Sequence, residues 1–446
     1  MRARLRGAAG WIARQEPAFV LLAAPLLLFP AQRPAWTAGA LGVLVTVWLL
    51  GWASSGRPSA PTPMDLALLL FALMVPVAVW VSPAPDLTLP KLTGLILGLA
   101  AFRATANAVR APSDLRPAAA VFLLLGLGFV LVGAAGAYWP NKIAALQPLL
   151  DRLPRLVHDL PGTEYGVHPN ELGGTVLFFL PVGLALVVSR ANGRGGGHIL
   201  ARVLTFMLCL FFAAVLVLSQ SRSAWVGALA GLAVVAWLRW RRARWPILVI
   251  LLLLLVGLLV MAPSLSAEMT QPGPDSRAVV DAGSLGERSD PWVRSVDMIA
   301  RFPLTGSGLG AYRQIAYLFG PVPLSRPDDD VAHAHNVFLQ VAVDVGLPGL
   351  VAYLALLGMA LWCASQVLGQ QVVRRGEGPP AGLATGIVGA LVAFHVYGIT
   401  DTIALGAKPG LGFWLLLALA AATWKVSQGA GAEGGAPAPG PEGEAP

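Results

Sequence analysis

The chain has 446 residues, of which 56% are hydrophobic and 12% are charged. Because a soluble globular protein carries about 25% charged residues, this composition excludes an ordinary soluble enzyme and indicates an integral membrane protein. The net charge of +8 does not predict nucleic-acid binding, since the basic residues are scattered among short loops and form no patch with interleaved aromatic residues. Cys209 and Cys363 lie inside apolar segments, so no disulfide framework is expected.

Apolar segments recur along the whole chain, and a helix needs roughly 20 such residues to cross a bilayer. Twelve segments approach that length: residues 17–31, 35–53, 64–82, 89–109, 117–137, 170–189, 199–219, 223–239, 245–262, 337–363, 380–400 and 409–426. They are continuous rather than alternating, and lipid offers the backbone no hydrogen-bond partner. The sequence therefore predicts an all-α, polytopic bundle of about 12 transmembrane helices. The first segment is short and the fourth contains Lys91, so ten or eleven helices remain possible.

The order of these segments predicts four regions. Residues 1–262 are expected to form nine transmembrane helices, residues 263–336 a large, partly helical extracytoplasmic loop, and residues 337–427 three further helices. Residues 428–446 are rich in Gly, Pro, Ala and Glu, so we expect a disordered cytoplasmic tail. The first apolar segment follows a basic start but lacks a convincing cleavage site, which favours a retained helix over a signal peptide.

Basic residues in the short loops predict the orientation. Clusters such as "RWRRAR" at residues 239–244, and Arg374 with Arg375, fall on one side of the predicted bundle together with the basic N-terminus. By the positive-inside rule this side is cytoplasmic. Both termini are then cytoplasmic, and residues 138–168 and 263–336 lie outside the cytoplasmic membrane.

The short stretch "SQSRSAW" connects the seventh and eighth segments and contains Arg222. A helix N-terminus supplies free N–H groups, and a guanidinium beside it adds a charged donor fork, so the pair can bind an anion. The alternative is an arginine that reaches the membrane surface at a helix end.

The stretch "GERSDPWVRSVDMIARFPLTGSGLGAYRQ" lies in the large predicted loop. Helical spacing of its apolar residues predicts a helix that starts at Ser289 or Asp290 with Pro291, which puts Arg288 just before an N-terminus, as at Arg222. The following "GSGLGAY" resembles a phosphate-binding loop, but it follows no strand. We interpret these glycines as a tight surface turn.

The stretch "VAHAHNVFLQ" begins the tenth segment. Asn336, Gln340 and Asp344 are four residues apart and share one helix face. A polar stripe in an apolar helix faces the bundle interior or a water-filled cavity; hydrogen bonding between helices is the alternative to a functional role.

His335 admits three interpretations: a hydrogen bond to the loop backbone, a metal ligand with His333 and the acidic run at residues 328–330, or a general base. His-x-His without a further His, Cys or placed carboxylate is a weak metal signal, and the acidic run is typical of a solvated loop face. We therefore expect no metal. We favour the base over the structural role because of the neighbouring arginines, with Asn336 and His333 as supporting residues.

Two further outer positions carry polar residues. In "YGVHPNELGGT", Asn170 and Glu171 are expected to cap the helix after Pro169, and Asn170 is a further supporting residue. Lys91 follows Pro90 near the start of the fourth segment; it is either an additional cation for the site or a lysine that reaches the surface.

Taken in order, "SRSAW", "RSDPW", "PLTGSGLGAY" and "AHNVFLQVAVDVGLPGLVAYL" resemble the O-antigen ligase and polymerase superfamily, over about residues 160–365. The resemblance implies transfer of a glycan from a polyprenyl diphosphate to an acceptor hydroxyl at the outer face of the cytoplasmic membrane, without metal, cofactor or nucleotide sugar. It further implies that His335 is catalytic and that Arg222 and Arg288 hold the diphosphate, with Lys91 assisting.

These roles agree with the chemistry of the residue types. Guanidinium groups stabilise the charge that develops on a leaving diphosphate, and a histidine takes the proton of the attacking hydroxyl. A single in-line displacement inverts the anomeric configuration, whereas a double displacement needs a carboxylate nucleophile, for which only Glu287 and Asp290 are at hand.

Other functions remain open. A polymerase uses the same donor and differs only in its acceptor, and the single long loop favours a ligase by analogy alone. A secondary transporter is a more distant alternative, with a broken helix at Gly346–Gly349 and a proton relay of His395 with Asp401. A non-catalytic flippase or assembly partner is the third.

Overall fold

The computed structural model describes residues 9–139, 142–153, 155–158, 166–189, 196–250, 252–253, 282–319, 332–374 and 379–433. Within these ranges the regular structure is helical, apart from one isolated bridge between Ala137 and Val167. The predicted all-α class is therefore confirmed for the described part of the chain.

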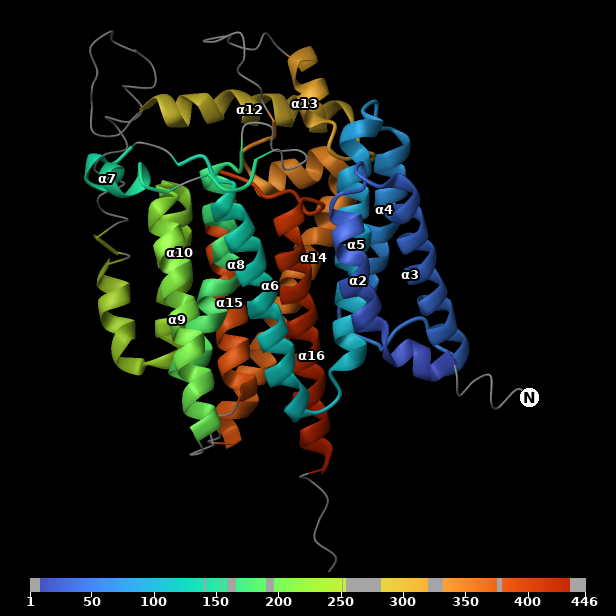
Figure 1. The fold of residues 1–446 in the computed structure, drawn as a ribbon, viewed down its shortest axis with the longest axis vertical. Helices are drawn as coiled ribbons and strands as arrows, with labels where there is room; N and C mark the ends of the chain where they lie inside the picture. Colours follow the sequence, from blue (N-terminus) through green and yellow to red (C-terminus); the bar gives the residue numbers. More distant parts are fainter. Residues whose placement is uncertain are drawn as a thin grey trace, which may run out of the picture.

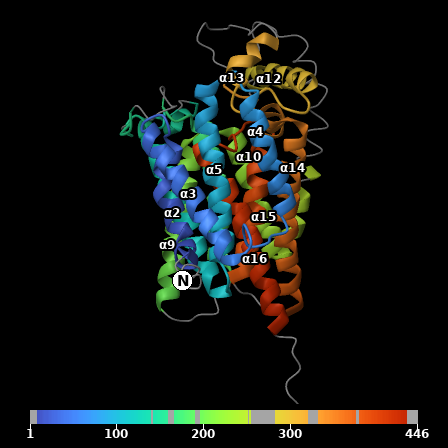
Figure 2. The ribbon, with the colours of Figure 1, turned by 90° about the vertical axis from the view of Figure 1, so that its right-hand side faces the viewer.

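Long helices run side by side along the long axis of the molecule (Figures 1 and 2). They are α2 (Glu16–Leu28), α3 (Pro34–Ser55), α4 (Asp65–Trp80), α5 (Pro85–Ala108), α6 (Leu115–Ala135), α8 (Pro169–Val188), α9 (Gly196–Leu218), α10 (Arg222–Arg239), α14 (Val337–Arg374), α15 (Pro379–Tyr397) and α16 (Leu411–Glu433). Each corresponds to a predicted segment. The ninth predicted segment, residues 245–262, lies largely outside the described residues.

Eight helical stretches of the described chain are long and apolar enough to cross a membrane by length and composition: those of α3, α5, α6, α8, α9, α14, α15 and α16. The apolar helices α2 and α4 are shorter. A multi-pass membrane protein follows from these helices, while the count of twelve stays a prediction.

Short elements cover one end of this bundle. The helices α12 (Ala282–Arg301) and α13 (Tyr312–Ile315), with the 3₁₀ turn η4 (Ala316–Phe319), lie across the top in Figure 1. The described chain begins and ends at the opposite end. Further short elements are η1 (Pro112–Asp114), η2 (Ala144–Leu146), α7 (Gln147–Leu150), η3 (Arg241–Ala243) and η5 (Lys408–Gly410).

The most enclosed helix is α16, which packs against α5 and α14. Small residues allow this close approach: a Cβ atom at Gly98 of α5 would lie 2.3 Å from Cδ1 of Trp414. Trp414 and Phe413 of α16 are fully buried, whereas large apolar side chains such as Leu49 of α3 are exposed. Helix packing therefore forms the interior, and an apolar outer surface is left for lipid.

α14 is not continuous, and its break lies in the Gly346–Gly349 stretch where the transporter alternative placed a broken helix. Gly346 has φ 74° and ψ 175°, which breaks the helix, and this conformation is essentially restricted to glycine. Beyond the break, the Leu347 N–H donates to the Pro303 carbonyl at 2.7 Å. The break is thus stabilised by the segment that follows α12.

Two predicted boundaries are wrong. α12 begins at Ala282 rather than at Ser289 or Asp290 and continues through Pro291, because the residues before Pro291 include good helix formers and the proline removes only one backbone donor. α16 extends to Glu433, so the predicted disordered tail is helical over its first residues, 428–433. Residues 434–446 lie outside the described part.

Candidate functional site

His335 lies in the short connection that leads into α14. Its φ of 47° is in the left-handed region, which is uncommon for a residue with a side chain and frequent at functional sites. The Nε1–H of Trp292 on α12 donates to the His335 carbonyl at 3.3 Å, and the His335 N–H donates to Nδ1 of His333 at 3.3 Å. α12 and His333 therefore fix this strained backbone.

Asn336 caps α14. Its Oδ1 accepts from the N–H groups of Phe338 at 2.9 Å and Leu339 at 3.0 Å. Its Nδ2 donates to the Ile399 carbonyl at 2.9 Å. The cap of α14 is therefore Asn336, which leaves the His335 imidazole available and joins the start of α14 to the chain after α15.

The chain after α15 brings Asp401 to His335, with 3.6 Å between the carboxylate Oδ1 and the imidazole Nδ1. The Asp401 side chain is 4% exposed and that of His335 is 32% exposed. The Val337 N–H donates to the Gly398 carbonyl at 2.7 Å, and the Thr402 N–H donates to Asp401 Oδ1 at 2.9 Å. These backbone contacts determine where the carboxylate lies.

Burial by itself would raise the pKa of the Asp401 carboxyl group. The contact with His335 and the charges of His333 and His335 outweigh this effect, so the pKa of Asp401 lies below its ordinary value. Asp401 is therefore an ionised carboxylate beside an imidazole. In the described part of the chain, neither Asp401 Oδ2 nor His335 Nδ1 has a hydrogen-bond partner.

The second histidine of the "HAH" stretch completes this cluster. The rings of His333 and His335 meet edge to face, with 4.2 Å between centroids. Desolvation lowers the pKa of His333 below its ordinary value, and the charge of His335 lowers it further. His333 is therefore neutral at neutral pH.

The glycine turn at residues 306–310 is buried, so its assignment to the surface is wrong. The Ser307 N–H donates to the Val343 carbonyl of α14 at 2.8 Å, and the Leu309 N–H donates to the Ala78 carbonyl of α4 at 3.1 Å. Gly308 has φ 115°, and a Cβ atom there would lie 2.5 Å from Ser82 Cα. Glycine permits this backbone approach, which no solvent-exposed turn requires.

Beneath the glycine turn, the predicted polar stripe of α14 faces the bundle interior, as expected, at Gln340 (4% exposed) and Asp344 (7% exposed). Gln340 Nε2 and the Gly310 N–H both donate to Asp344 Oδ1, at 3.0 and 3.1 Å. Gln340 Oε1 accepts from the Ala334 N–H at 2.8 Å. The stripe therefore links α14 to the glycine turn and to the histidine segment.

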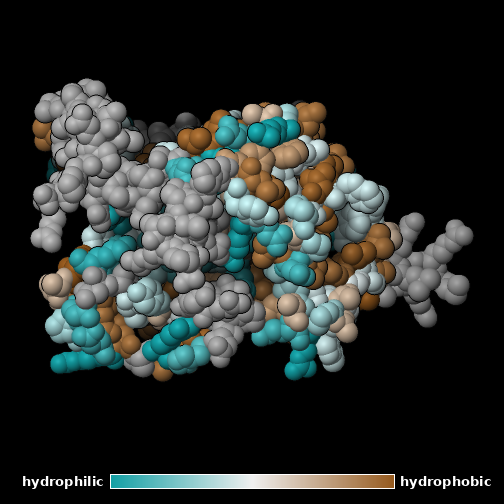
Figure 3. Space-filling view, turned by 90° about the horizontal axis from the view of Figure 1, so that it is seen from above, coloured by the Kyte–Doolittle hydropathy of each residue, from teal (hydrophilic) through white to brown (hydrophobic). Residues whose placement is uncertain are grey.

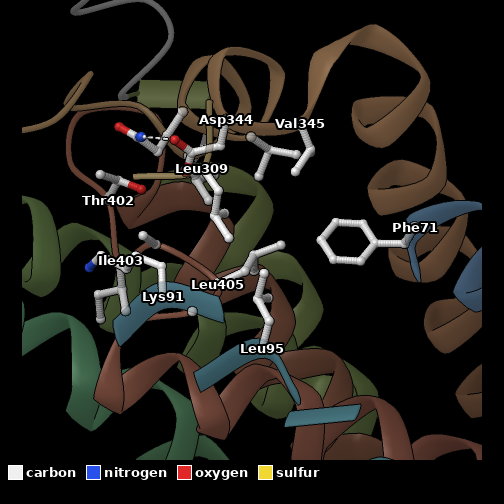
Figure 4. A pocket seen from close by; sticks show the side chains of 14 residues that line it. Phe71, Lys91, Leu95, Leu309, Asp344, Val345, Thr402, Ile403 and Leu405 are labelled. Carbon is white, nitrogen blue, oxygen red and sulfur yellow. Dashed lines mark hydrogen bonds between the residues drawn. The ribbon is translucent and has the colours of Figure 1, made fainter. Parts of the chain in front are cut away.

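A small cavity lies beside this stripe (Figure 4). Asp344 and Thr402 lie toward one end of the view, and Phe71 of α4 lies at the other, with Leu95 of α5 below. Lys91 also lines the cavity. One end of the cavity is therefore polar and the other end is apolar.

Lys91 belongs to this end of the bundle. It lies in the second turn of α5, which begins at Pro85, and it is near enough to Asp344 and His333 for their charges to interact. Lys408, at the start of η5, is also near enough to Lys91 for the two charges to interact. Sequence reasoning missed Lys408, although it too is a lysine beside a proline at the start of an apolar segment.

Arg222 is the first residue of α10, and its side chain is exposed. Ser221 caps this helix through its hydroxyl, which accepts from the Ala224 N–H at 3.4 Å. Gln220 before it has φ 49°, and its Oε1 accepts from the Lys142 and Ile143 N–H groups at 2.9 and 2.8 Å. The predicted position of Arg222 at a helix N-terminus is confirmed, at the end of the bundle covered by α12 (Figure 1).

Arg288 does not repeat that arrangement, because α12 begins at Ala282 and contains it. Its side chain lies outside the described part, so its role in holding the diphosphate with Arg222 stays a prediction. Arg294 on the same helix is buried, at 2% exposed, and pairs with Asp290 at 2.8 Å. It also donates to the Ala316 carbonyl at 3.1 Å, which attaches α12 to η4.

Asn170 and Glu171 are not the cap of α8, contrary to expectation. α8 begins at Pro169, so the cap is the preceding residue, His168, whose Nδ1 accepts from the Asn170 N–H at 3.2 Å. The Asn170 carbonyl accepts from the Tyr397 hydroxyl at 3.1 Å, which ties α8 to α15. His168 lies close enough to Asp401 and His335 to interact with their charges.

The proposed relay between His395 and Asp401 is not formed. His395 Nε2 lies 2.6 Å from the Tyr353 hydroxyl, and its Nδ1 lies 2.6 Å from the Leu391 carbonyl, while Asp401 faces His335. The acidic run at residues 328–330 lies outside the described part. Figure 3 shows the molecule from the end that α12 covers, where hydrophilic and hydrophobic side chains of the described residues lie next to one another.

The described part of the chain is thus a bundle of apolar helices with a histidine, a buried carboxylate and lysines at one end. Residues 207–354 match the O-antigen ligase family model, and this match confirms the resemblance to that superfamily. The segment contains Arg222, Arg288 and His335, and it indicates a glycan-processing enzyme of the ligase or polymerase kind. No match was found among the curated proteins.

Proposed function

We propose that the chain is a glycosyltransferase, which moves a glycan from a polyprenyl diphosphate to an acceptor hydroxyl at the outer face of the cytoplasmic membrane. The observation that carries this proposal is the contact between His335 and the buried Asp401, 3.6 Å from Nδ1 to Oδ1, inside a helical bundle. The match of residues 207–354 to the O-antigen ligase family supports it.

His335 is the general base. Its Nδ1 faces Asp401, so Nε2 is the nitrogen that accepts the proton of the acceptor hydroxyl. The carboxylate holds the ring and stabilises the imidazolium that forms, as an aspartate does in a serine protease triad. Asn336 and His333 support this geometry through the hydrogen bonds at the start of α14. Asn170 supports it more remotely, by joining α8 to α15.

Arg222, Arg288 and Lys91 bind the diphosphate. As the acceptor oxygen bonds to the anomeric carbon, the bond from that carbon to the diphosphate oxygen breaks, and the electron pair leaves with the diphosphate. Fixed guanidinium and ammonium donors stabilise that charge without reorganisation. Attack opposite the leaving group inverts the anomeric configuration, and no residue has to become covalently attached.

A polymerase is the alternative, because it performs the same chemistry with a lipid-linked repeat as acceptor. A cell that lacks a ligase accumulates finished polymer on the lipid carrier, whereas a cell that lacks a polymerase accumulates single repeats. Mass analysis of the lipid-linked glycans in a deletion strain therefore separates the two.

The same strain tests the function through His335→Ala. Wild-type chain should clear the accumulated lipid-linked glycan, and His335→Ala should leave it in place, because the attacking hydroxyl then has no base. His198→Ala is the control, since His198 lies in α9 near the opposite end of the bundle. Normal clearance by His335→Ala, with wild-type amounts of chain in the membrane, would remove the base assignment.

A further inference from the structure

Three possible metal ligands from two segments of the chain converge beside the proposed base. One ring nitrogen of His333, one of His335 and a carboxylate oxygen of Asp401 lie within 4.8 Å of one another. In the sequence alone, "HAH" is only a weak metal signal, because no carboxylate can be placed beside it. In the folded chain, Asp401 from the segment after α15 provides that carboxylate.

The separation within the cluster suits a shared ion better than a direct hydrogen bond. His335 Nδ1 and Asp401 Oδ1 are 3.6 Å apart, whereas a charge-assisted hydrogen bond spans about 2.7–2.9 Å. Two ligands of a tetrahedral zinc ion, each about 2.1 Å from the metal, are about 3.4 Å apart. The two atoms therefore need to move little to hold one ion between them.

Unsatisfied polar atoms point to the same conclusion. Asp401 is 3% exposed, and in the described part its Oδ2 and the buried Nδ1 of His335 have no hydrogen-bond partner. Buried polar atoms of this kind are rare without an ion or water to satisfy them. This is an observation separate from the spacing of the three side chains.

We propose that His333, His335 and Asp401 bind a divalent ion of the zinc class, and that the bound ion inhibits glycan transfer. Two imidazoles and one carboxylate match the ligand preference of Zn²⁺ and leave one position open. His333 coordinates through Nε2, because its Nδ1 accepts from the His335 N–H; a hydrogen bond at the other ring nitrogen orients a metal-binding histidine. The nearby Lys91 opposes a bound cation, so we expect binding to be reversible.

Inhibition follows from the position of the ion and rests on the proposed function. A cation at Nδ1 of His335 replaces the contact with Asp401 and withdraws electron density from the ring. Nε2 then accepts a proton from the acceptor hydroxyl poorly. Zinc binding itself does not depend on what the enzyme transfers.

Binding is tested with purified full-length chain and ⁶⁵Zn²⁺ in equilibrium dialysis. We expect one ion per chain at this site, and at least about tenfold weaker binding by Asp401→Asn and His333→Gln, since even the outer partners of a metal ligand contribute that much. Gln at residue 333 keeps an acceptor for the His335 N–H, which preserves the fold. His198→Gln, a histidine of α9, should bind as the wild type does; equal binding by His333→Gln would overturn the site.

Inhibition is tested with membranes that carry the chain and with lipid-linked glycan isolated from the deletion strain. Zn²⁺ should slow transfer by the wild type, chelator should restore it, and the residual transfer by His333→Gln should respond at least about tenfold less to zinc. Undiminished transfer at saturating zinc would overturn the inhibitory role. Zinc binding in a chain that transfers no glycan even with chelator would instead overturn the proposed function and leave the metal site standing.

Discussion

In the proposed mechanism, Asp401 acts through His335. The carboxylate is buried and ionised, and it faces the ring nitrogen that points away from the proposed acceptor. An ionised partner on that side holds the ring in its orientation. Asp401 is thus a positioning residue, and its contribution can be separated from donor binding.

Asp401→Asn should lower the turnover of glycan transfer by about 10- to 100-fold, the range seen when an outer partner of a functional histidine is removed. The amide keeps the shape of the side chain but cannot stabilise an imidazolium. Initial rates over a range of donor concentrations should show a small change in KM. A raised KM with unchanged turnover would assign Asp401 to donor binding instead.

Arg222→Lys should lower kcat/KM for the donor by about 100-fold, comparable to the loss of one fixed donor to a developing charge. An ammonium group keeps the charge but cannot present two parallel N–H groups to a phosphate. Arg239→Lys is the matched control, because Arg239 ends the same helix at the opposite end of the bundle. Equal rates in the two variants would indicate that Arg222 only reaches the membrane surface.

Sequence reasoning singled out His335 because two histidines and an asparagine stand where an apolar segment begins. It could not assign Asp401, since spacing along the chain does not say which of two histidines a carboxylate will face. It paired Asp401 with His395, which is nearer in sequence, whereas the loop after α15 folds back to His335. The start of α10 at Arg222 needed only local signals and was predicted correctly.

At the scale of elements, the glycine turn at residues 306–310 and the break in α14 at Gly346 form a joint, in which their backbones are in direct contact. A Cβ atom at Gly346 would lie 2.5 Å from the Leu304 carbonyl oxygen, and one at Gly306 would lie 2.6 Å from the Val343 carbonyl oxygen. The two backbones therefore touch, and the contact places Asp344 under the turn through the Gly310 N–H. This joint connects α12 to the helix that carries the site.

Gly346→Ala should destabilise the chain by about 1–3 kcal/mol, because φ 74° with ψ 175° is strained for alanine, and the added methyl group meets the Leu304 carbonyl. Gly358→Ala in the same helix is the control, since a Cβ atom there meets nothing within 4 Å. Thermal unfolding in detergent should show a lower midpoint for Gly346→Ala alone. Equal unfolding midpoints for the two variants would mean that the joint accommodates the added methyl group without loss of stability.

The helices that form the bundle could be predicted because a long apolar run has few alternatives in a membrane. Helix boundaries in the polar segment could not: Pro291 resembles a start signal, yet α12 begins at Ala282. The burial of the glycine turn was also beyond prediction. It depends on contacts with Ala78, Ser82 and Val343, which are distant in sequence.

For the whole molecule, the arrangement of the bundle makes the sidedness of the site testable. The described chain begins and ends at one end of the bundle, and α12 lies at the other. His335 lies at the end with α12, because its carbonyl accepts a hydrogen bond from Trp292 of that helix. The basic cluster at residues 239–244 follows α10, which starts at the site end with Arg222 and runs away from it. If the basic end is cytoplasmic, as the positive-inside rule predicts, then His335 faces outward.

Single cysteines at the two ends should therefore react from opposite sides of the membrane. Tyr317, in η4 at the site end, is 59% exposed, and Trp240, at the far end of α10, is 46% exposed. In a background with the buried Cys209 and Cys363 replaced by alanine, we expect Tyr317→Cys to react with a membrane-impermeant maleimide on intact cells. Trp240→Cys should react only after lysis.

The reverse pattern would place His335 in the cytoplasm and rule out transfer at the outer face, although the fold would still hold. Reaction of both cysteines on intact cells would contradict the bundle itself, because the two positions lie at opposite ends of it. The experiment therefore distinguishes an error of orientation from an error of fold. Only the predicted pattern gives the proposed base access to an acceptor outside the cytoplasm.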